Sequence, residues 1–216
     1  MFQIFENAWT HNDLEWFYQD MQKIKQTERS QSSDNPNYKD PDSLRWKCEK
    51  NTESRNQLEE KISKLLPKHQ INFAAYVEQH KPNKLHCDSY GGPFGVTCII
   101  PLLKYKNDTD QTLVFDYLSV ESDNTNSILD KLQQETEKNI PKFRHTKKYK
   151  LNHCNPSKNI LKNPVDWISL LGVFPYQYQN MVAFDKRLLH CSNDWLSTDP
   201  TRQHKDFIII HTYAKY

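Results

Sequence analysis

The sequence is organised around one continuous stretch of residues, which reads Leu85-His86-Cys87-Asp88-Ser89-Tyr90-Gly91-Gly92-Pro93-Phe94-Gly95-Val96-Thr97-Cys98-Ile99-Ile100. It joins a His-x-Asp pair to a turn that holds three of the four glycines of the protein, and then to an apolar run typical of a β-strand. Because side chains on a strand alternate between two faces, we predict that His86 and Asp88 project from one face and Cys87 from the other. The pair therefore predicts two ligands of a metal site.

A third ligand is predicted at His190, which lies in the apolar-flanked segment 181–191. Two histidines and one carboxylate on one face of an octahedral ion leave three positions open. This facial triad is the ligand set of non-heme Fe(II) oxygenases. His86, Asp88 and His190 together therefore predict an iron-dependent oxygenase.

The His-x-Asp pattern alone does not identify a site, because it occurs twice more in this chain. The copy that begins at His11 opens a predicted helix, where residues two apart do not face each other. The copy that begins at His204 lies on a predicted strand, but only His211 follows it, too close in sequence to come from another strand. The context therefore favours the middle copy, which has both the glycine turn and a distant histidine.

Length and composition limit the class of protein. A chain of 216 residues is the size of one domain, so we expect a single domain over 1–216, with an N-terminal strand and supporting helices in 1–68 and a β core in 69–216. A net charge of +2 creates no strong field toward nucleic acid or anionic membrane. Five cysteines without Cys-x-x-Cys spacing argue against a disulfide framework and a thiolate zinc cluster, and favour a reducing compartment.

The expected location follows from the apolar segments. The N-terminal residues lack the basic region and the long apolar stretch of a signal peptide, and no later segment is long enough to cross a bilayer. We therefore expect a soluble, cytoplasmic protein.

Hydrophobic periodicity predicts helices in the N-terminal part of the chain. After a short strand at 2–5, Thr10 begins a capping box, and a helix continues to about Thr27. A second helix is predicted over 52–66, because Pro67 ends its apolar stripe. The segment 28–50 has no sustained period and predicts a surface loop, with Tyr38, Leu44 and Trp46 as possible anchors.

Strand signals dominate the rest of the sequence. Strands are predicted at 71–77, 96–103, 112–120, 165–171 and 206–213, with a short helix at 127–138. The segments 181–184 and 188–191 predict a hairpin that carries His190. Ile71, Phe73, Ala75 and Val77 are expected to share one strand face. Pro101 is expected to lie at an edge or bulge. Helices followed by many short strands favour two packed antiparallel sheets.

Several of these features together resemble the 2-oxoglutarate/Fe(II)-dependent oxygenases, in particular the prolyl-4-hydroxylase-like group. They are His86-Cys87-Asp88, Gly91-Gly92, the strand at 96–99, the segment 184–190 and a terminal strand preceded by a basic residue. The similarity covers roughly 70–213. It implies a mainly β (α+β) fold, a double-stranded β-helix of the jelly-roll or cupin-like type with supporting N-terminal helices. It also implies Fe(II) held by His86, Asp88 and His190, with 2-oxoglutarate chelating the metal.

The resemblance further implies contacts to 2-oxoglutarate. Tyr76 occupies the place of a tyrosine that hydrogen-bonds the co-substrate. A basic residue near the start of the last strand pairs with the distal carboxylate, and two residues compete for this role. Arg202 offers a planar fork that suits a carboxylate, whereas Lys205 lies directly before the apolar run and alternates with Phe207.

The activity implied by the resemblance is hydroxylation of a C–H bond with consumption of 2-oxoglutarate and O2 and formation of succinate and CO2, with ascorbate as a stimulant. The substrate is a peptidyl residue such as proline or, alternatively, a free amino acid or other small molecule. A catalytically inactive β-sandwich binding module is the alternative from another class. Trp195 and His211 are expected near the substrate pocket. The basic stretch 141–150 is interpreted as a solvated face rather than a nucleic-acid site, and no membrane partner is expected.

Overall fold

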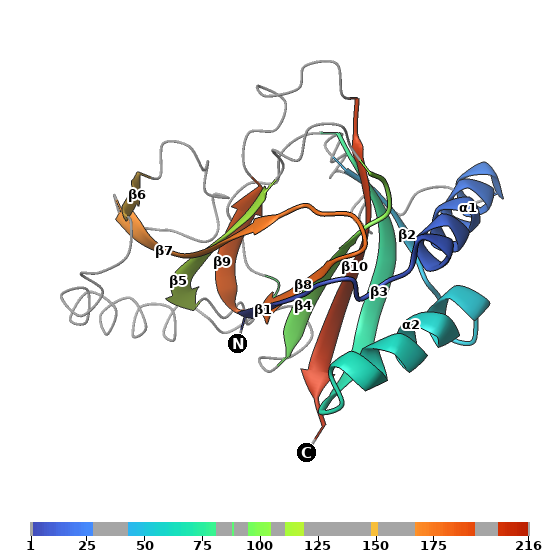
Figure 1. Ribbon diagram of the computed structural model, residues 1–216, viewed down its shortest axis with the longest axis horizontal. Helices are drawn as coiled ribbons and strands as arrows, with labels where there is room; N and C mark the ends of the chain where they lie inside the picture. Colours follow the sequence, from blue (N-terminus) through green and yellow to red (C-terminus); the bar gives the residue numbers. More distant parts are fainter. Residues whose placement is uncertain are drawn as a thin grey trace, which may run out of the picture.

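Two antiparallel sheets and two helices make up the part of the protein that the structure describes (Figure 1). The structure is a computed structural model, and it describes residues 2–27, 43–80, 88, 95–104, 111–118, 148–150, 167–192 and 203–215. The helices cover one face of the larger sheet, and the smaller sheet lies over its other face. The predicted mainly β architecture with N-terminal helices is confirmed.

The larger sheet has six strands with antiparallel neighbours, in the order β1 (Phe2–Phe5), β8 (Met181–Asp185), β4 (Val96–Pro101), β10 (Lys205–Ala214), β3 (His69–Gln79) and β2 (Ser43–Lys47). β10 lies between β3 and β4, and its apolar run is buried on both faces, as the sequence predicted, because the helices cover one face and the smaller sheet the other. Ile208 and Ile210 contact the core under the helices, whereas Phe207 and Ile209 contact the core between the sheets.

The smaller sheet has four strands, in the order β6 (Lys148–Lys150), β7 (Trp167–Pro175), β5 (Gln111–Leu118) and β9 (Leu188–Ser192). Val114 of β5, Phe174 of β7 and Leu188 of β9 pack against Val77 and Ile209 of the larger sheet. Two sheets that each bury an apolar face in this way form a β-sandwich core.

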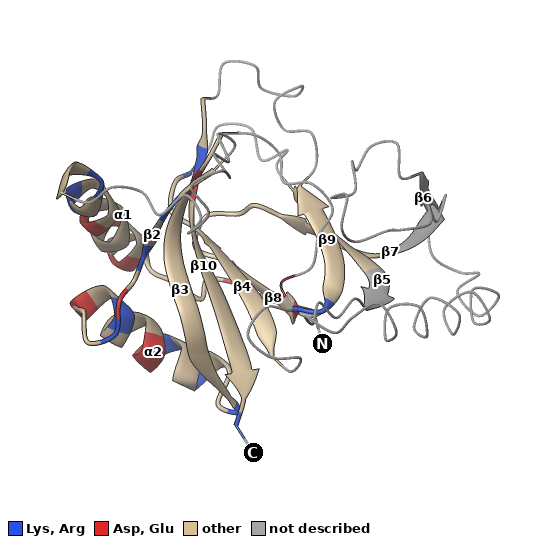
Figure 2. Cartoon of the chain, turned by 180° about the vertical axis from the view of Figure 1, so that it is seen from behind, with Lys and Arg blue, Asp and Glu red and all other residues tan. Residues whose placement is uncertain are grey.

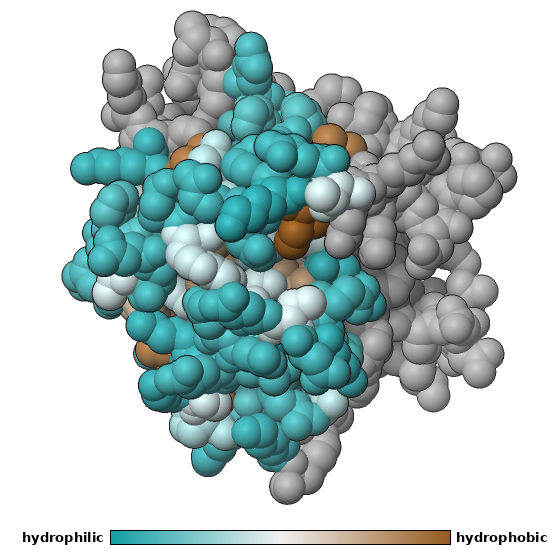
Figure 3. Space-filling view, turned by 90° about the vertical axis from the view of Figure 1, so that its right-hand side faces the viewer, coloured by the Kyte–Doolittle hydropathy of each residue, from teal (hydrophilic) through white to brown (hydrophobic). Residues whose placement is uncertain are grey.

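The helices α1 (His11–Thr27) and α2 (Glu53–Leu65) begin where the sequence predicted. The backbone N–H of Thr10 donates to Oδ2 of Asp13 at 2.9 Å, and the N–H of Asp13 donates to Oγ1 of Thr10 at 3.1 Å, which completes the expected capping box. Leu14, Phe17 and Met21 of α1 are buried against the larger sheet. Charged residues are frequent on both helices (Figure 2), and the face over them is mostly hydrophilic (Figure 3).

One strand was missed by the sequence analysis. Residues 43–47, predicted as part of a loop, form β2 and pair with β3, with Arg45 opposite Val77. Trp46 is buried in the core under the helices, so the prediction that it anchors this segment is confirmed. Residues 48–50 belong to no helix or strand, as predicted, and 28–42 lie outside the described residues.

The predicted hairpin of β8 and β9 is wrong. β8 pairs with β1 and β4 of the larger sheet, whereas β9 pairs with β5 of the smaller sheet, with His190 opposite Val114. The turn between them is held by Arg187, whose backbone N–H and Nε donate to Oδ1 of Asp185 at 3.0 and 2.9 Å. The chain therefore passes from one sheet to the other within this turn, and His190 lies on the smaller sheet.

Two smaller predictions also need correction. The pairing of β10 with β3 shifts register between His211 and Thr212, and Ile71 consequently joins the core under the helices instead of sharing the face of Val77. Pro101 is the last residue of a central strand rather than of an edge strand, but β8 pairs only with 96–99, so no partner on that side needs its missing N–H.

Three further predictions concern other parts of the chain. The predicted helix at 127–138 lies outside the described residues, as does the basic stretch apart from 148–150, which forms β6. Cys48, Cys98 and Cys191 are buried, and Cys48 and Cys98 are free thiols. Among the residues described, no helix has the length and apolar character that crossing a membrane requires.

Candidate metal centre and pocket

Two of the three predicted metal ligands lie side by side. Nε2 of His190 on β9 is 3.1 Å from Oδ2 of Asp88, and both side chains are buried. The backbone N–H of Asp88 donates to the carbonyl of Lys186 at 2.8 Å, which fixes Asp88 beside the turn between β8 and β9. His86 lies outside the described residues. Asp88 itself is described without a strand assignment, so the predicted strand around His86 stays a prediction.

The imidazole of His190 is held in one orientation. Its Nδ1 lies 3.0 Å from the carbonyl oxygen of Leu188, which can only accept, so Nδ1 carries the proton and donates. The ring also packs against Phe184, with 4.7 Å between centroids. Burial lowers the pKa of His190, but the charge and hydrogen bond of Asp88, together with the Leu188 carbonyl, outweigh it and raise the pKa above its usual value. Nε2 is thus the nitrogen aimed at the carboxylate.

Asp88 is oriented in turn by Thr97 of β4. Oγ1 of Thr97 donates to Oδ2 of Asp88 at 2.8 Å and lies 3.1 Å from Nδ1 of His211. Since the hydroxyl has one proton and gives it to Asp88, Nδ1 of His211 is the donor in the second bond. His211 stacks on Phe73, and burial lowers its pKa. His211, predicted near the substrate pocket, therefore lies behind the carboxylate and supports it through Thr97.

The two placed side chains fit a metal ion. Ligand atoms about 2.1 Å from an ion and 90° apart lie about 3.0 Å from each other, close to the 3.1 Å between His190 and Asp88. Protonation of Nδ1 leaves Nε2 free to coordinate, and a backbone carbonyl that fixes the tautomer is a usual partner of a ligating histidine. Asp88 and His190 could therefore hold a metal with the predicted third ligand, His86.

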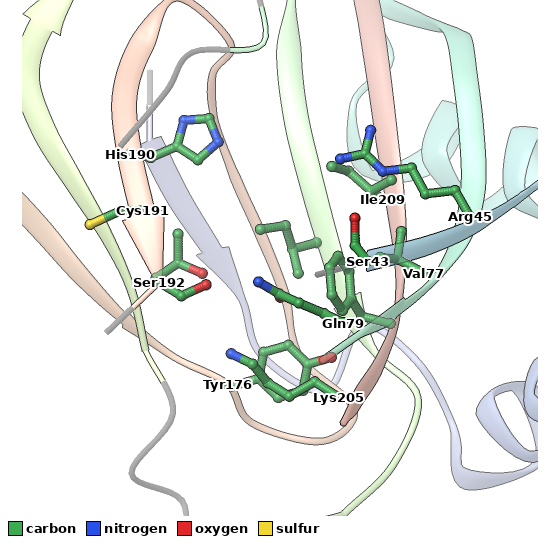
Figure 4. Close-up of a pocket in the computed structure, with 13 residues that line it drawn as sticks. Ser43, Arg45, Val77, Gln79, Tyr176, His190, Cys191, Ser192, Lys205 and Ile209 are labelled. Carbon is green, nitrogen blue, oxygen red and sulfur yellow. The ribbon is translucent and has the colours of Figure 1, made fainter. Parts of the chain in front are cut away.

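A pocket opens beside His190, between the two sheets. Its walls include Arg45, Gln79, Tyr176, His190, Ser192 and Lys205. Figure 4 shows His190 on one wall and Arg45 on the other, with Gln79, Tyr176 and Lys205 toward the base. The pocket thus combines a predicted metal ligand with two cationic side chains.

Of the two residues that competed for the co-substrate carboxylate, the structure brings Lys205 to this pocket. The Lys205 side chain is 2% exposed, and its Nζ lies 5.1 Å from the ring centroid of Tyr176. The hydroxyl of Tyr176 donates to the carbonyl of Asp206 at 2.8 Å, which fixes the ring against β10. Arg202 and Trp195 lie outside the described residues.

The predicted role of Tyr76 needs correction. Its side chain points to the helices, where the hydroxyl donates to Oδ2 of Asp20 at 2.7 Å. Burial raises the pKa of Tyr76 well above its usual value. Its neighbour Val77 lines the pocket, and successive residues of a strand face opposite ways, so the Tyr76 hydroxyl does not reach the pocket.

Two residues of this region were not selected from the sequence. Thr97 is a single hydroxyl within the apolar run of β4, and such a buried polar group needs a partner, which was a usable signal. Arg45 was hidden in the predicted loop. The alternation of Leu44 and Trp46 with more polar neighbours is the pattern that could have revealed β2.

Comparison with known proteins supports the fold. No protein-family model and no curated protein matches the sequence. The α-ketoglutarate-dependent epimerase SnoN from nogalamycin biosynthesis aligns with a TM-score of 0.61 and 8% identity, over 100% of this chain and 81% of its own. HygX from Streptomyces hygroscopicus, with nickel and 2-oxoglutarate bound, gives a TM-score of 0.54 and 12% identity over 100% and 83%.

A Pseudomonas putida prolyl-4-hydroxylase aligns over 100% of this chain and 92% of its own, with a TM-score of 0.50 and 8% identity. At such low identity these likenesses establish the fold. The chain has the jelly-roll fold of these proteins, and its structural neighbours include a non-heme α-ketoglutarate-dependent enzyme, a protein with 2-oxoglutarate bound and a prolyl-4-hydroxylase, in line with the sequence resemblance.

Proposed function

We propose that this protein is a 2-oxoglutarate- and Fe(II)-dependent dioxygenase whose metal ligands are His86, Asp88 and His190. The observation that carries the proposal is the 3.1 Å approach of His190 Nε2 to Asp88 Oδ2 at a pocket that also contains Lys205. The neighbours' dependence on 2-oxoglutarate and non-heme iron supports the choice of metal and co-substrate.

Each residue of the site has a defined task in this proposal. Asp88 supplies the anionic ligand, and Thr97 keeps its carboxylate turned toward His190. Lys205 donates to the distal carboxylate of 2-oxoglutarate, and a buried ammonium makes such a charge-assisted hydrogen bond strong. When bound, Fe(II) and 2-oxoglutarate supply the chemistry that reduces O2, oxidises a substrate C–H bond to C–OH and releases succinate and CO2.

The proposed reaction is hydroxylation of a peptidyl residue such as proline or of a free small molecule. The structural neighbours support both substrate classes, because they include a prolyl-4-hydroxylase and enzymes of antibiotic biosynthesis. Arg45 gives the pocket a second cation and supports a substrate that carries an anionic group. A screen of peptides and free amino acids for a mass gain of one oxygen separates the two classes.

The proposal is tested by succinate release from purified protein supplied with Fe(II), ascorbate and 2-oxoglutarate. We expect slow release without substrate and its loss in H190A and D88A. H11A, which alters an exposed histidine of the first His-x-Asp copy on α1, is the matched control and should release succinate like the wild type. Equal release from H190A, D88A and the wild type would reject the enzyme and favour a binding module.

A further inference from the structure

A second group of potential metal ligands lies where β3 ends and β10 begins. Glu78 is on β3, His80 follows the end of that strand, and His204 directly precedes β10. One donor atom from each of these residues lies within 4.8 Å of the other two. Nε2 of His80 is 2.9 Å from Oε1 of Glu78, and the two imidazole rings are 5.7 Å apart between centroids.

This group is separate from the pocket that contains His190. Glu78 is paired with Asp206 across β3 and β10, whereas the neighbouring residues Gln79 and Lys205 line the pocket. Because successive strand residues face opposite ways, Glu78 projects from the face of the larger sheet that carries the helices. Its contact with Lys25 of α1 agrees with this direction.

The spacing of the donors suits a small divalent cation. Two ligand atoms about 2.0–2.1 Å from a tetrahedral ion lie about 3.3 Å apart. The 2.9 Å between His80 and Glu78 is close to this value, and a donor atom of His204 lies within 4.8 Å of both. The imidazoles of His80 and His204 are about one third exposed, so an ion and a water molecule can reach them. Two imidazoles and one carboxylate are donors that zinc accepts readily.

One ionisable group near this site favours a bound cation, and another opposes it. Oδ2 of Asp206 lies 3.4 Å from Nε2 of His204 and adds a second carboxyl group, fully buried, behind the site, and burial raises the pKa of this carboxyl. Lys25 contacts Oε2 of Glu78, which leaves Oε1 directed at His80. The ammonium of Lys25 therefore neutralises Glu78 in the absence of an ion and would oppose a bound cation.

We propose that Glu78, His80 and His204 form a second divalent-cation site, of the zinc class, on the helix-covered face of the larger sheet. The ion joins the end of β3 to the beginning of β10, on the face of the larger sheet that is opposite to the pocket. Water occupies the position that the three side chains leave open.

The test is titration of the metal-free, full-length protein with Zn2+ in competition with a chromophoric chelator. The D88A/H190A variant removes the first centre, so the expected result is one remaining equivalent of tightly bound zinc. Adding H80A or E78Q to this variant should weaken that binding at least about tenfold. Circular dichroism without metal verifies that each variant is folded. Loss of all tight binding in D88A/H190A, or unchanged binding after H80A and E78Q, would overturn the proposal.

A substitution of Lys25 provides a second test, in which zinc binding is expected to become tighter rather than weaker. K25Q in the D88A/H190A variant removes the competing ammonium, so the same titration should show tighter zinc binding, whereas weaker or unchanged binding would contradict a cation at Glu78. The inference is independent of the proposed oxygenase activity. H80A alone should keep the Fe(II)-dependent release of succinate, and failure of either proposal is thus recognised separately.

Discussion

The hydroxyl of Thr97 donates a 2.8 Å hydrogen bond to Oδ2 of Asp88, the same oxygen that faces Nε2 of His190. A carboxylate can rotate about its side-chain bonds, and this bond from β4 limits the rotation. Because His211 donates to Thr97 on the other side, the hydroxyl itself is held in one direction. The orientation of one metal ligand thus depends on a buried threonine that does not touch the metal.

T97V should weaken metal binding while leaving the protein folded. Valine has nearly the same shape but no hydroxyl, so Asp88 loses its orienting bond and Nδ1 of His211 loses its acceptor. The expected loss of Mn(II) affinity is about 10–100-fold, measured by calorimetry. T97S keeps the hydroxyl and should bind Mn(II) nearly as the wild type does. Equal affinities in T97V and T97S would show that the bond has no influence on the site.

The cation that recognises 2-oxoglutarate can be identified by comparing two residues of the same pocket. K205M should raise the KM for 2-oxoglutarate in the succinate assay at least about tenfold, because a buried charge-assisted contact is lost. R45M, on the wall across from His190, should change this KM little. R202M tests the alternative that the sequence left open. A large effect in R202M together with a normal K205M would assign the role to Arg202.

G95A should destabilise the fold. Gly95 has φ +158, and a Cβ added there would lie 1.9 Å from the carbonyl oxygen of Thr212. Since that oxygen belongs to the backbone of β10, relief requires a shift of the central strand, and we expect a loss of about 3 kcal/mol. Urea denaturation followed by circular dichroism measures the change. A urea midpoint equal to that of the wild type would mean that β4 and β10 move apart to accept the methyl group without loss of stability.

The turn between β8 and β9 should lose stability in acid. Burial raises the pKa of Asp185, but the hydrogen bonds and charge of Arg187 outweigh it and hold the pKa below its usual value. A carboxyl with a lowered folded-state pKa stabilises above the unfolded-state pKa, about 3.9, and this contribution disappears as pH falls through the folded-state value.

D185N should therefore be about 1 kcal/mol less stable than the wild type at pH 7, with the difference closing below about pH 4. Denaturant midpoints at several pH values give the comparison. E60Q, which removes one member of the exposed Lys64 pair on α2, serves as the control and should shift the midpoint little. A deficit of D185N that stayed constant down to pH 3 would exclude this linkage.

K186M should stabilise the protein. The Lys186 side chain is buried in the same turn, and within the described part of the chain its Nζ has no hydrogen-bond partner. Burial lowers the pKa of Lys186 despite the nearby charges of Asp88 and Asp185. Methionine fills a similar space without a charge, and a gain of about 1 kcal/mol in unfolding free energy is expected. K64M on exposed α2 is the control, and a less stable K186M would contradict the argument.

The parts of the fold that depend on local pattern were predicted from the sequence. The apolar run 207–210, the capping box at Thr10 and the helical period of α1 are local signals that can be read from neighbouring residues alone. The approach of His190 to Asp88 was also predicted, because an imidazole and a carboxylate in apolar surroundings suggested a shared partner. These features need little knowledge of how distant strands pair.

The predictions that failed depend on long-range pairing. A short turn between two strands looks the same whether they form a hairpin or enter different sheets, and β8 and β9 do the latter. Alternation along β3 places Tyr76 and Val77 on different faces of the sheet. It does not reveal which of the two faces packs against the helices. β2 is short and charged, as edge strands often are. Its pairing with β3 makes it a strand, and this pairing cannot be read from its own five residues.

Asp88 connects the two layers of the sandwich. Its carboxylate receives Thr97 from β4 of the larger sheet and faces His190 from β9 of the smaller one. A metal ion bound there would link the two sheets. Amide hydrogen exchange in β4 and in β9 should therefore slow together when the metal binds. A chelator would then remove the link between the two sheets that form the pocket, and the protein would lose rigidity there together with its metal-dependent chemistry.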